Sequence, residues 1–209
     1  AAGVELVRGF VPLHATGSAG VSGLVVRAMV GDKASGEQRT LPCDAIGMAG
    51  GWNPAIHLYS HSGGMVRWDE AAACFAPGVA MPAQALVGAC RATWTLGKTL
   101  DDASRAGAGA AIAAGFAATA TQFRVSEPAQ EPIAAFWIAE TGEPVSRRAK
   151  AFVDYQNDVA ASDIELAIRE GFESIEHIKR YTALGFGTDQ GKLGNINGMA
   201  LAARALKKP

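Results

Sequence analysis

Residues 85–116 read ALVGACRATWTLGKTLDDASRAGAGAAIAAGF, and this stretch decides the fold that the sequence predicts. It begins with a short apolar run, Ala85 to Val87, which ends at Gly88. Alanines then recur at helical spacing: Ala103, Ala106, Ala110, Ala113 and Ala114. We therefore expect a strand, a turn and a helix of small residues. At the carboxyl edge of an open α/β sheet, such a turn lets the main chain approach a pyrophosphate. The alternative is that the small residues only let the helix pack closely on a sheet.

The composition is that of an ordinary globular protein. The 209 residues are 49% hydrophobic and 19% charged, enough for one large domain or two small ones. A net charge of -1 gives no electrostatic reason to expect nucleic acid or a membrane as a partner. Three cysteines without metal or disulfide spacing indicate idle thiols in a reducing compartment, so we expect a cytoplasmic protein. The chain begins AAGVELVRGF without Met, which we interpret as the start of an internal piece of a longer polypeptide.

The first fifty residues have the pattern of a β-meander. Residues 4–7, 11–14 and 24–30 are short apolar runs that we expect to form strands, the first of them buried. The polar stretch 31–39 predicts a hairpin tip, and 41–49 predicts the returning strand. The order of these runs excludes a βαβ unit in this part of the chain.

The sequence CDAIGMAGGWNP, residues 43–54, completes a recognisable order of motifs. A meander, then D-x-x-x-x-A-G-G-x-x-P, then the turn at Gly88 and an alanine-rich helix resembles the closing third of the two-dinucleotide-binding flavoprotein fold. In that family an Asp follows the turn glycine and meets the flavin, whereas Ala89 stands here. The departure removes a polar contact with FAD and leaves room for another dinucleotide. No GxGxxG fingerprint follows a strand, so the resemblance implies that the phosphate-binding half lies upstream.

Histidines and acidic residues between residues 57 and 77 do not form a metal motif. His57 and His61 precede a Ser-Gly-Gly turn, and Asp69 and Glu70 belong to an expected surface hairpin and helix start. The GxSxG nucleophile elbow is also absent from the sequence. We therefore predict neither a metal site nor a catalytic residue in this chain.

The last sixty residues predict a small helical domain after a proline-punctuated linker with one strand at 133–138. Ser162 and Glu165 form a capping-box pattern, and Gly171 is the expected stop of that helix. Further helices are expected from Ser174 and over 197–206. Between them, the glycine-rich loop 185–194 is expected to present backbone amides beside polar side chains that suit a phosphate.

Three segments of this domain, FVDYQNDV (152–159), IREGFESIEHIKRYTALGFGTDQGK (168–192) and NINGMA (195–200), resemble the alpha subunit of heterotetrameric sarcosine oxidase. The domain is also similar to the small [2Fe-2S] domain of the bacterioferritin-associated ferredoxin type. The positions that match the cluster cysteines are Asp154, Gln156, Asp189 and Gly194. Because these side chains cannot replace thiolates, no cluster is expected.

The resemblance implies an oxidoreductase that demethylates sarcosine to glycine with O2, giving peroxide and a one-carbon unit for folate. It implies FAD in the beta subunit, FMN at the alpha-beta interface, NAD in the alpha subunit, and gamma and delta subunits as further partners. The expected NAD contacts are Gly88, Ala89, Trp94 and Leu96. The expected FMN contacts are Lys179, Arg180, Thr188, Gln190 and Lys192. The isolated chain is expected to be inactive.

The expected fold class is α/β, with α+β character in this fragment. Residues 1–120 would be the C-terminal part of a Rossmann-like FAD/NAD(P)-binding domain, 121–150 a linker and 151–209 an all-helical domain. Two alternatives stay open: a subunit of a related amine or opine dehydrogenase, and a non-catalytic scaffold that binds cofactors and docks other subunits.

Overall fold

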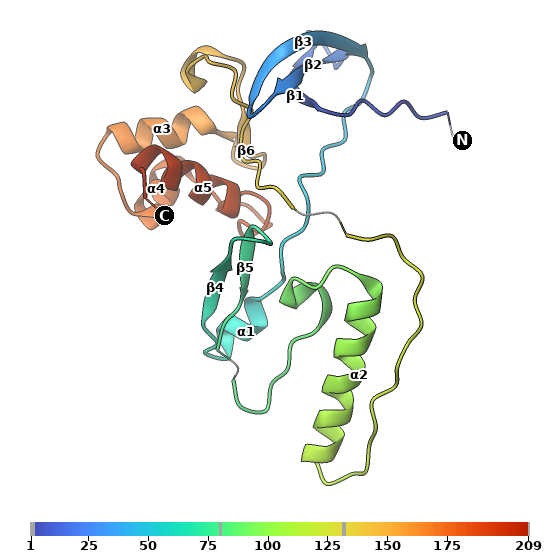
Figure 1. Ribbon diagram of the computed structural model, residues 1–209. Coiled ribbons are helices and arrows are strands. Elements are labelled where there is room, and N and C mark those ends of the chain that lie inside the picture. The colour runs from blue at the N-terminus through green and yellow to red at the C-terminus, as the bar shows by residue number, and fades with distance from the viewer. Residues whose placement is uncertain (1–2, 80, 131–132, 209) are drawn as a thin grey trace. The chain divides into compact units, whose positions relative to one another are not determined.

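The computed structural model describes residues 3–79, 81–130 and 133–208 (Figure 1). The chain divides into two compact units, Ala1–Met48 with Phe136–Pro209, and Ala49–Ala135. These units do not coincide with the domains predicted from the sequence, which are 1–120, 121–150 and 151–209. The predicted domains stay predictions. None of the helices in the described ranges is long and apolar enough to cross a membrane.

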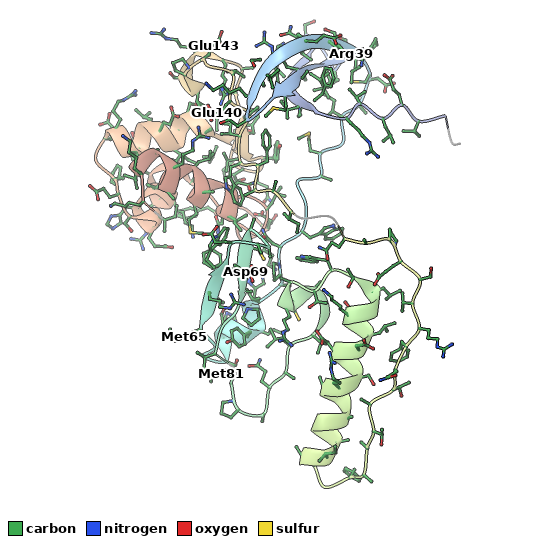
Figure 2. All side chains as sticks on the ribbon, in the orientation of Figure 1. Arg39, Met65, Asp69, Met81, Glu140 and Glu143 are labelled. Atoms are coloured by element: carbon green, nitrogen blue, oxygen red, sulfur yellow. The ribbon has the colours of Figure 1, made fainter. Side chains whose placement is uncertain are left out.

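The first unit begins with the expected antiparallel meander, β1 (Phe10–Thr16), β2 (Gly23–Val30) and β3 (Lys33–Pro42), paired in the order β1-β2-β3. The central strand is rich in β-branched residues, and it buries Val25 and Val26. Arg39 on β3, which is labelled in Figure 2, forms an ion pair of 3.3 Å with Glu5. The meander predicted from the apolar runs is therefore confirmed.

Two details of the meander were predicted wrongly. Residues 4–7 form no strand, and Val4 and Leu6 are exposed. The hairpin tip is only the turn at Gly31, whose φ of +64° suits glycine, so the returning strand begins at Lys33 instead of residue 41. This strand ends at Pro42, which has no amide to extend the ladder, and 43–54 is irregular. The part of the predicted returning strand over 43–49 is therefore not formed by these described residues.

The second unit contains α1 (His57–His61), β4 (Val66–Asp69), β5 (Cys74–Pro77), the 3-10 helix η1 (Gly88–Arg91) and α2 (Leu96–Ala113). β4 and β5 form the expected hairpin, in which the Trp68 and Phe75 rings meet edge to face at 5.2 Å. The predicted strand over 85–87 is not formed, since no other described segment of this unit pairs with it. The expected small-residue helix is present as α2.

The remainder of the first unit is η2 (Val145–Arg147), β6 (Phe152–Asp154), β7 (Val159–Ala160), α3 (Ala161–Arg169), α4 (Ile175–Thr182) and α5 (Asn195–Leu206). Its core consists of Val153, Val159, Ala161, Ile164, Ala167, Ile178, Leu184 and Ala202. The expected mixed α+β character is thus confirmed. The C-terminal region is helical but not all-helical, because β6 and β7 form a short hairpin. The predicted strand over 133–138 is not formed by the described residues.

The helix ends follow local rules, with one correction. The cap of α3 is Ala160, not Ser162, and the Asp163 carboxylate accepts a hydrogen bond of 2.8 Å from the Ala160 amide. Gly171 follows the end of α3 with φ +98°, as expected for a helix stop. The helix expected from Ser174 is α4, in which Ser174 has the N-cap position and its side chain forms no cap hydrogen bond.

Candidate functional site

The first candidate site is the turn that leads into α2. Gly88 opens η1 with φ +65°, and it is buried so closely that a Cβ there would lie 3.0 Å from Thr99 Cγ2. The Thr93 amide donates to the Gly88 carbonyl at 3.1 Å and closes the turn. Position 88 therefore favours glycine for two reasons: its φ is positive, and Thr99 fills the space that a side chain would need. Ala89 is exposed beside it.

A glutamate that the sequence did not single out occupies the N-terminus of α2. The Leu96 amide donates to Glu127 Oε2 at 2.7 Å, and the Gly97 amide donates to Glu127 Oε1 at 2.9 Å. Further along the helix, the Thr121 amide donates to Ser104 Oγ at 2.7 Å, so the segment before Glu127 runs back along α2 (Figure 1). An anion favours a helix N-terminus, and here the chain supplies its own.

Two polar atoms beside this turn have no hydrogen-bond partner among the described residues. They are the indole Nε1 of Trp94 and the hydroxyl of Thr95, both buried. Buried polar groups are usually paired, and those left unpaired often face a ligand or ordered water. Among the predicted NAD contacts, Trp94 therefore has an unused donor, whereas the space beside Gly88 is filled by Thr99. Leu96 adds an exposed apolar surface.

The second candidate site is the loop between α4 and α5, residues 185–194. The buried carboxylate of Asp154 accepts hydrogen bonds from the amides of Gly185 at 2.8 Å, Gln156 at 2.8 Å and Asn157 at 3.2 Å. Burial alone would raise the pKa of Asp154, but these amides together hold that pKa below its usual range. The loop is thus anchored to the β6–β7 hairpin by a charged group inside the protein.

Side-chain oxygens occupy several of the amides that the loop was expected to present. The Gln156 carboxamide accepts from the Thr188 amide at 2.6 Å and from its hydroxyl at 2.9 Å. Asp189 accepts from the amides of Gly191 and Leu193, each at 3.2 Å. The prediction that the loop's backbone amides are open to a phosphate is therefore wrong for the amides of Thr188, Gly191 and Leu193, which are already bonded within the protein.

The side chains predicted to contact FMN differ in how available they are. Lys179 is paired with Glu176 at 3.7 Å and is mostly buried. The side chains of Arg180 and Lys192 are exposed and form no ion pair with any described residue. Gln190 is also exposed, at φ +54°. An anionic ligand would therefore meet two unpaired cations.

The positions assigned to the missing cluster cysteines surround this same loop. Asp154, Gln156 and Asp189 bear its hydrogen bonds, and a Cβ at Gly194 would lie 2.7 Å from the Val153 carbonyl oxygen. Side chains at three of the four positions therefore hold this loop together by hydrogen bonds. Among the described residues no group of His, Cys, Asp and Glu is placed to bind a metal ion.

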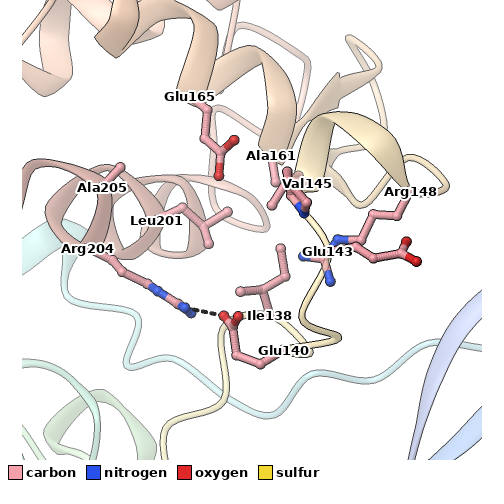
Figure 3. A pocket seen from close by; sticks show the side chains of 11 residues that line it. Ile138, Glu140, Glu143, Val145, Arg148, Ala161, Glu165, Leu201, Arg204 and Ala205 are labelled. Atoms are coloured by element: carbon pink, nitrogen blue, oxygen red, sulfur yellow. Dashed lines mark ion pairs between the residues drawn. The ribbon is translucent and has the colours of Figure 1, made fainter. Parts of the chain in front are cut away.

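A cavity of about 240 Å³ in the first unit lies beside α3 and α5 (Figure 3). Its lining residues are Ile138, Glu140, Glu143, Pro144, Val145, Arg148, Ala161, Glu165, Leu201, Arg204 and Ala205. Arg204 forms an ion pair with Glu140, and Arg148 Nη1 donates to the Ala139 carbonyl at 2.5 Å. These charges brace the segment before β6 against α5. Sequence reasoning did not identify this cavity, because its lining comes from three separate segments, 138–148, 161–165 and 201–205.

Comparison with solved structures defines the class of fold. The chain resembles L-proline dehydrogenase from P. horikoshii with a TM-score of 0.63, over 95% of this chain and 39% of that chain. The two are 19% identical, so the likeness concerns the fold alone. The class is a mixed α+β chain with small antiparallel sheets and a helical C-terminal region.

Comparison of sequences defines the family. Residues 148–209 match the model of the sarcosine oxidase A3 domain. The chain is 34% identical to the sarcosine oxidase alpha subunit of Corynebacterium sp. (strain P-1) over 98% of its length, and 40% identical to that of Rhizobium meliloti (strain 1021) over 81%. The matched region of the chain spans only 22% of the length of the Corynebacterium protein and 17% of the length of the Rhizobium protein. The chain is a segment of the sarcosine oxidase alpha-subunit family, and the predicted resemblance is confirmed.

Proposed function

We propose that this chain is a middle part of the alpha subunit of a heterotetrameric sarcosine oxidase, which demethylates sarcosine to glycine with O2. The observation that carries the proposal is the match to alpha subunits over 98% of the chain. Because the chain spans about a fifth of those relatives, we assign the reaction to the whole assembly. The FAD site, the folate site and the beta, gamma and delta subunits are assigned to other parts of the assembly. This chain is a cytoplasmic scaffold that holds cofactors, and it is inactive alone.

Within that assembly, residues 1–120 are proposed to supply part of an NAD site at Gly88, Ala89, Trp94 and Leu96. The tight turn at Gly88 and the unpartnered Trp94 donor support this assignment. The amides of Leu96 and Gly97 are already bonded to Glu127, so they are not assigned to the pyrophosphate. The main-chain contact is assigned to the turn, where Ala89 is exposed.

Residues 151–209 are proposed to border the FMN through the side chains of Lys179, Arg180, Thr188, Gln190 and Lys192. FMN, when bound, accepts electrons and passes them to O2. The unpaired cations suit its phosphate, and the hydrogen bonds of Gln156 and Asp189 hold the loop in one conformation. Residues 121–150 are proposed to connect the two sites.

The complete assembly, purified with all its subunits, tests this function. Extraction of its cofactors should release NAD and FMN, and sarcosine should drive O2 consumption and peroxide release. Oxidation of L-proline or another amine in place of sarcosine would favour a related amine or opine dehydrogenase. A colourless complex with no amine turnover would favour the docking scaffold.

A further inference from the structure

The cavity beside α3 and α5 combines aliphatic and charged side chains (Figure 3). Ile138, Val145 and Leu201 contribute the larger aliphatic groups. The volume of about 240 Å³ lies below the range of about 300–1,000 Å³ that is usual for pockets of drug-sized ligands, so a ligand here would be a smaller molecule. The titratable groups in the lining are Glu140, Glu143, Arg148, Glu165 and Arg204.

Two of these charged groups neutralise each other. Arg204 and Glu140 form an ion pair at one side of the cavity (Figure 3). In the same view the carboxylate of Glu143 is directed away from the aliphatic side chains. The charges that remain for a ligand are therefore those of Arg148 and Glu165.

The guanidinium group of Arg148 has only neutral hydrogen-bond partners. Its Nη1 donates to the Ala139 carbonyl at 2.5 Å and to the Thr141 hydroxyl at 3.4 Å. Its Nε is buried and has no hydrogen-bond partner among the described residues. A buried charge without a counter-charge is destabilising, and the hydrogen bond from a guanidinium to a carboxylate is among the strong ones in proteins. Arg148 therefore favours a ligand that carries a carboxylate.

Glu165 supplies the opposite charge. It lies on α3, and its carboxylate is directed toward Leu201 on α5 (Figure 3). Glu165 forms neither an ion pair nor a hydrogen bond through its side chain with any residue that the structure describes. Because Glu165 and Arg148 do not pair with each other, a ligand that satisfies both needs an ammonium group and a carboxylate.

The backbone that carries these side chains is held in place within the first unit. The Ala34 amide on β3 donates to the Glu140 carbonyl at 2.7 Å, and the Arg147 amide donates to the Pro144 carbonyl at 2.9 Å. Ala161, which also lines the cavity, belongs to the hydrophobic core. The walls of the cavity therefore need not fold when a ligand binds, which lowers the entropy cost of binding.

We propose that this cavity binds a small zwitterion of the amino-acid class. Its carboxylate accepts from Arg148, its ammonium group lies against Glu165, and its hydrocarbon part contacts the aliphatic lining. A ligand with a single charge would leave one of the two groups unpaired, and this selects the zwitterion. The inference goes beyond the proposed function and does not depend on it, because it uses none of the residues assigned to NAD or FMN.

Calorimetric titration of the full-length alpha subunit with L-valine and with 4-aminobutyrate tests the proposal. The two probes carry the same charges at different separations. At least one of them should bind about tenfold more tightly than isobutylamine, which lacks the carboxylate, and isovalerate, which lacks the ammonium group. The same zwitterion should slow hydrogen exchange in peptides covering 138–148 and 161–169.

Glu165→Gln is the decisive variant, because the Glu165 side chain has no partner among the described residues and the fold does not need its charge. It should weaken binding of the zwitterion at least about tenfold. Arg148→Lys, which removes the Nε donor, should weaken it to a similar degree. Glu170→Gln is the matched control, since Glu170 is exposed at the end of the same helix and does not line the cavity.

The outcomes separate clearly. If neither zwitterion binds the wild-type subunit, the proposal is overturned. It is also overturned if isobutylamine or isovalerate binds as tightly as the zwitterions, or if their affinity is the same in Glu165→Gln as in wild type. An equal loss of affinity in Glu170→Gln would show that the site lies elsewhere, with the same consequence.

Discussion

Asp154 accepts a hydrogen bond of 2.8 Å from the amide of Gly185, which lies 31 residues further along the chain. The same carboxylate accepts from two amides of its own turn, so one buried charge joins the β6–β7 hairpin to the loop between α4 and α5. This relationship places the side chains of Thr188, Gln190 and Lys192 on a loop of defined shape. The site proposed for FMN therefore depends on a residue that would not itself touch FMN.

Asp154 should make the stability of this chain depend on pH. Its folded-state pKa is lowered, so its contribution is fully present above the unfolded value of about 4 and is lost as the pH falls through the folded pKa. Asp154→Asn should remove this pH dependence and lower the free energy of unfolding by about 3 kcal/mol at pH 7. The reason is that the buried amides lose a charged hydrogen-bond acceptor. Urea unfolding of both forms between pH 2 and pH 7 measures this. Equal pH profiles would show that Asp154 is not the responsible group.

Gly191 should tolerate no side chain. It has φ +75°, and a Cβ would collide with the Asn195 side chain. Gly142 is a matched control in the same unit, since its φ is +81° and nothing lies within 4 Å of a Cβ there. Both alanine substitutions put a side chain on backbone with positive φ, which lowers the free energy of unfolding by about 1 kcal/mol. Only Gly191→Ala also displaces the Asn195 side chain. Thermal melts should rank Gly191→Ala well below Gly142→Ala. Indistinguishable melting temperatures would contradict the packing around Asn195.

Glu127 should stabilise the start of α2. Glu127→Ala removes the acceptor for the amides of Leu96 and Gly97 and should cost about 1 kcal/mol, the usual effect of losing a helix cap. Exchange of both amides should accelerate, while that of the Ala114 amide at the other end of α2 should not change. Site-resolved hydrogen exchange by NMR measures each amide separately. Unchanged rates at Leu96 and Gly97 would mean that the cap is not held in solution.

The helix stop at Gly171 and the helix start near Ser174 were predicted correctly, because their signals lie within a turn of the helix end. The cap expected at Ser162 was also a local signal, but Ala160 has the cap position instead. The strand expected at 85–87 depended on a pairing partner elsewhere, and an apolar run carries no information about whether one exists. Likewise, the partners of Glu127 and Asp154 lie 30 or more residues away, so spacing alone could not indicate them.

The NAD affinity of the Trp94→Phe variant tests whether the turn at Gly88 belongs to an NAD site. The substitution removes an indole donor that has no partner among the described residues, so without ligand the fold should be as stable as wild type or gain about 1 kcal/mol. If that donor serves the nucleotide, calorimetric titration of the full-length alpha subunit should show NAD affinity reduced about tenfold. Trp52→Phe, at a residue 86% exposed in the same unit, should leave the affinity unchanged. Equal NAD affinity in wild type and Trp94→Phe would contradict the proposed site at the Gly88 turn.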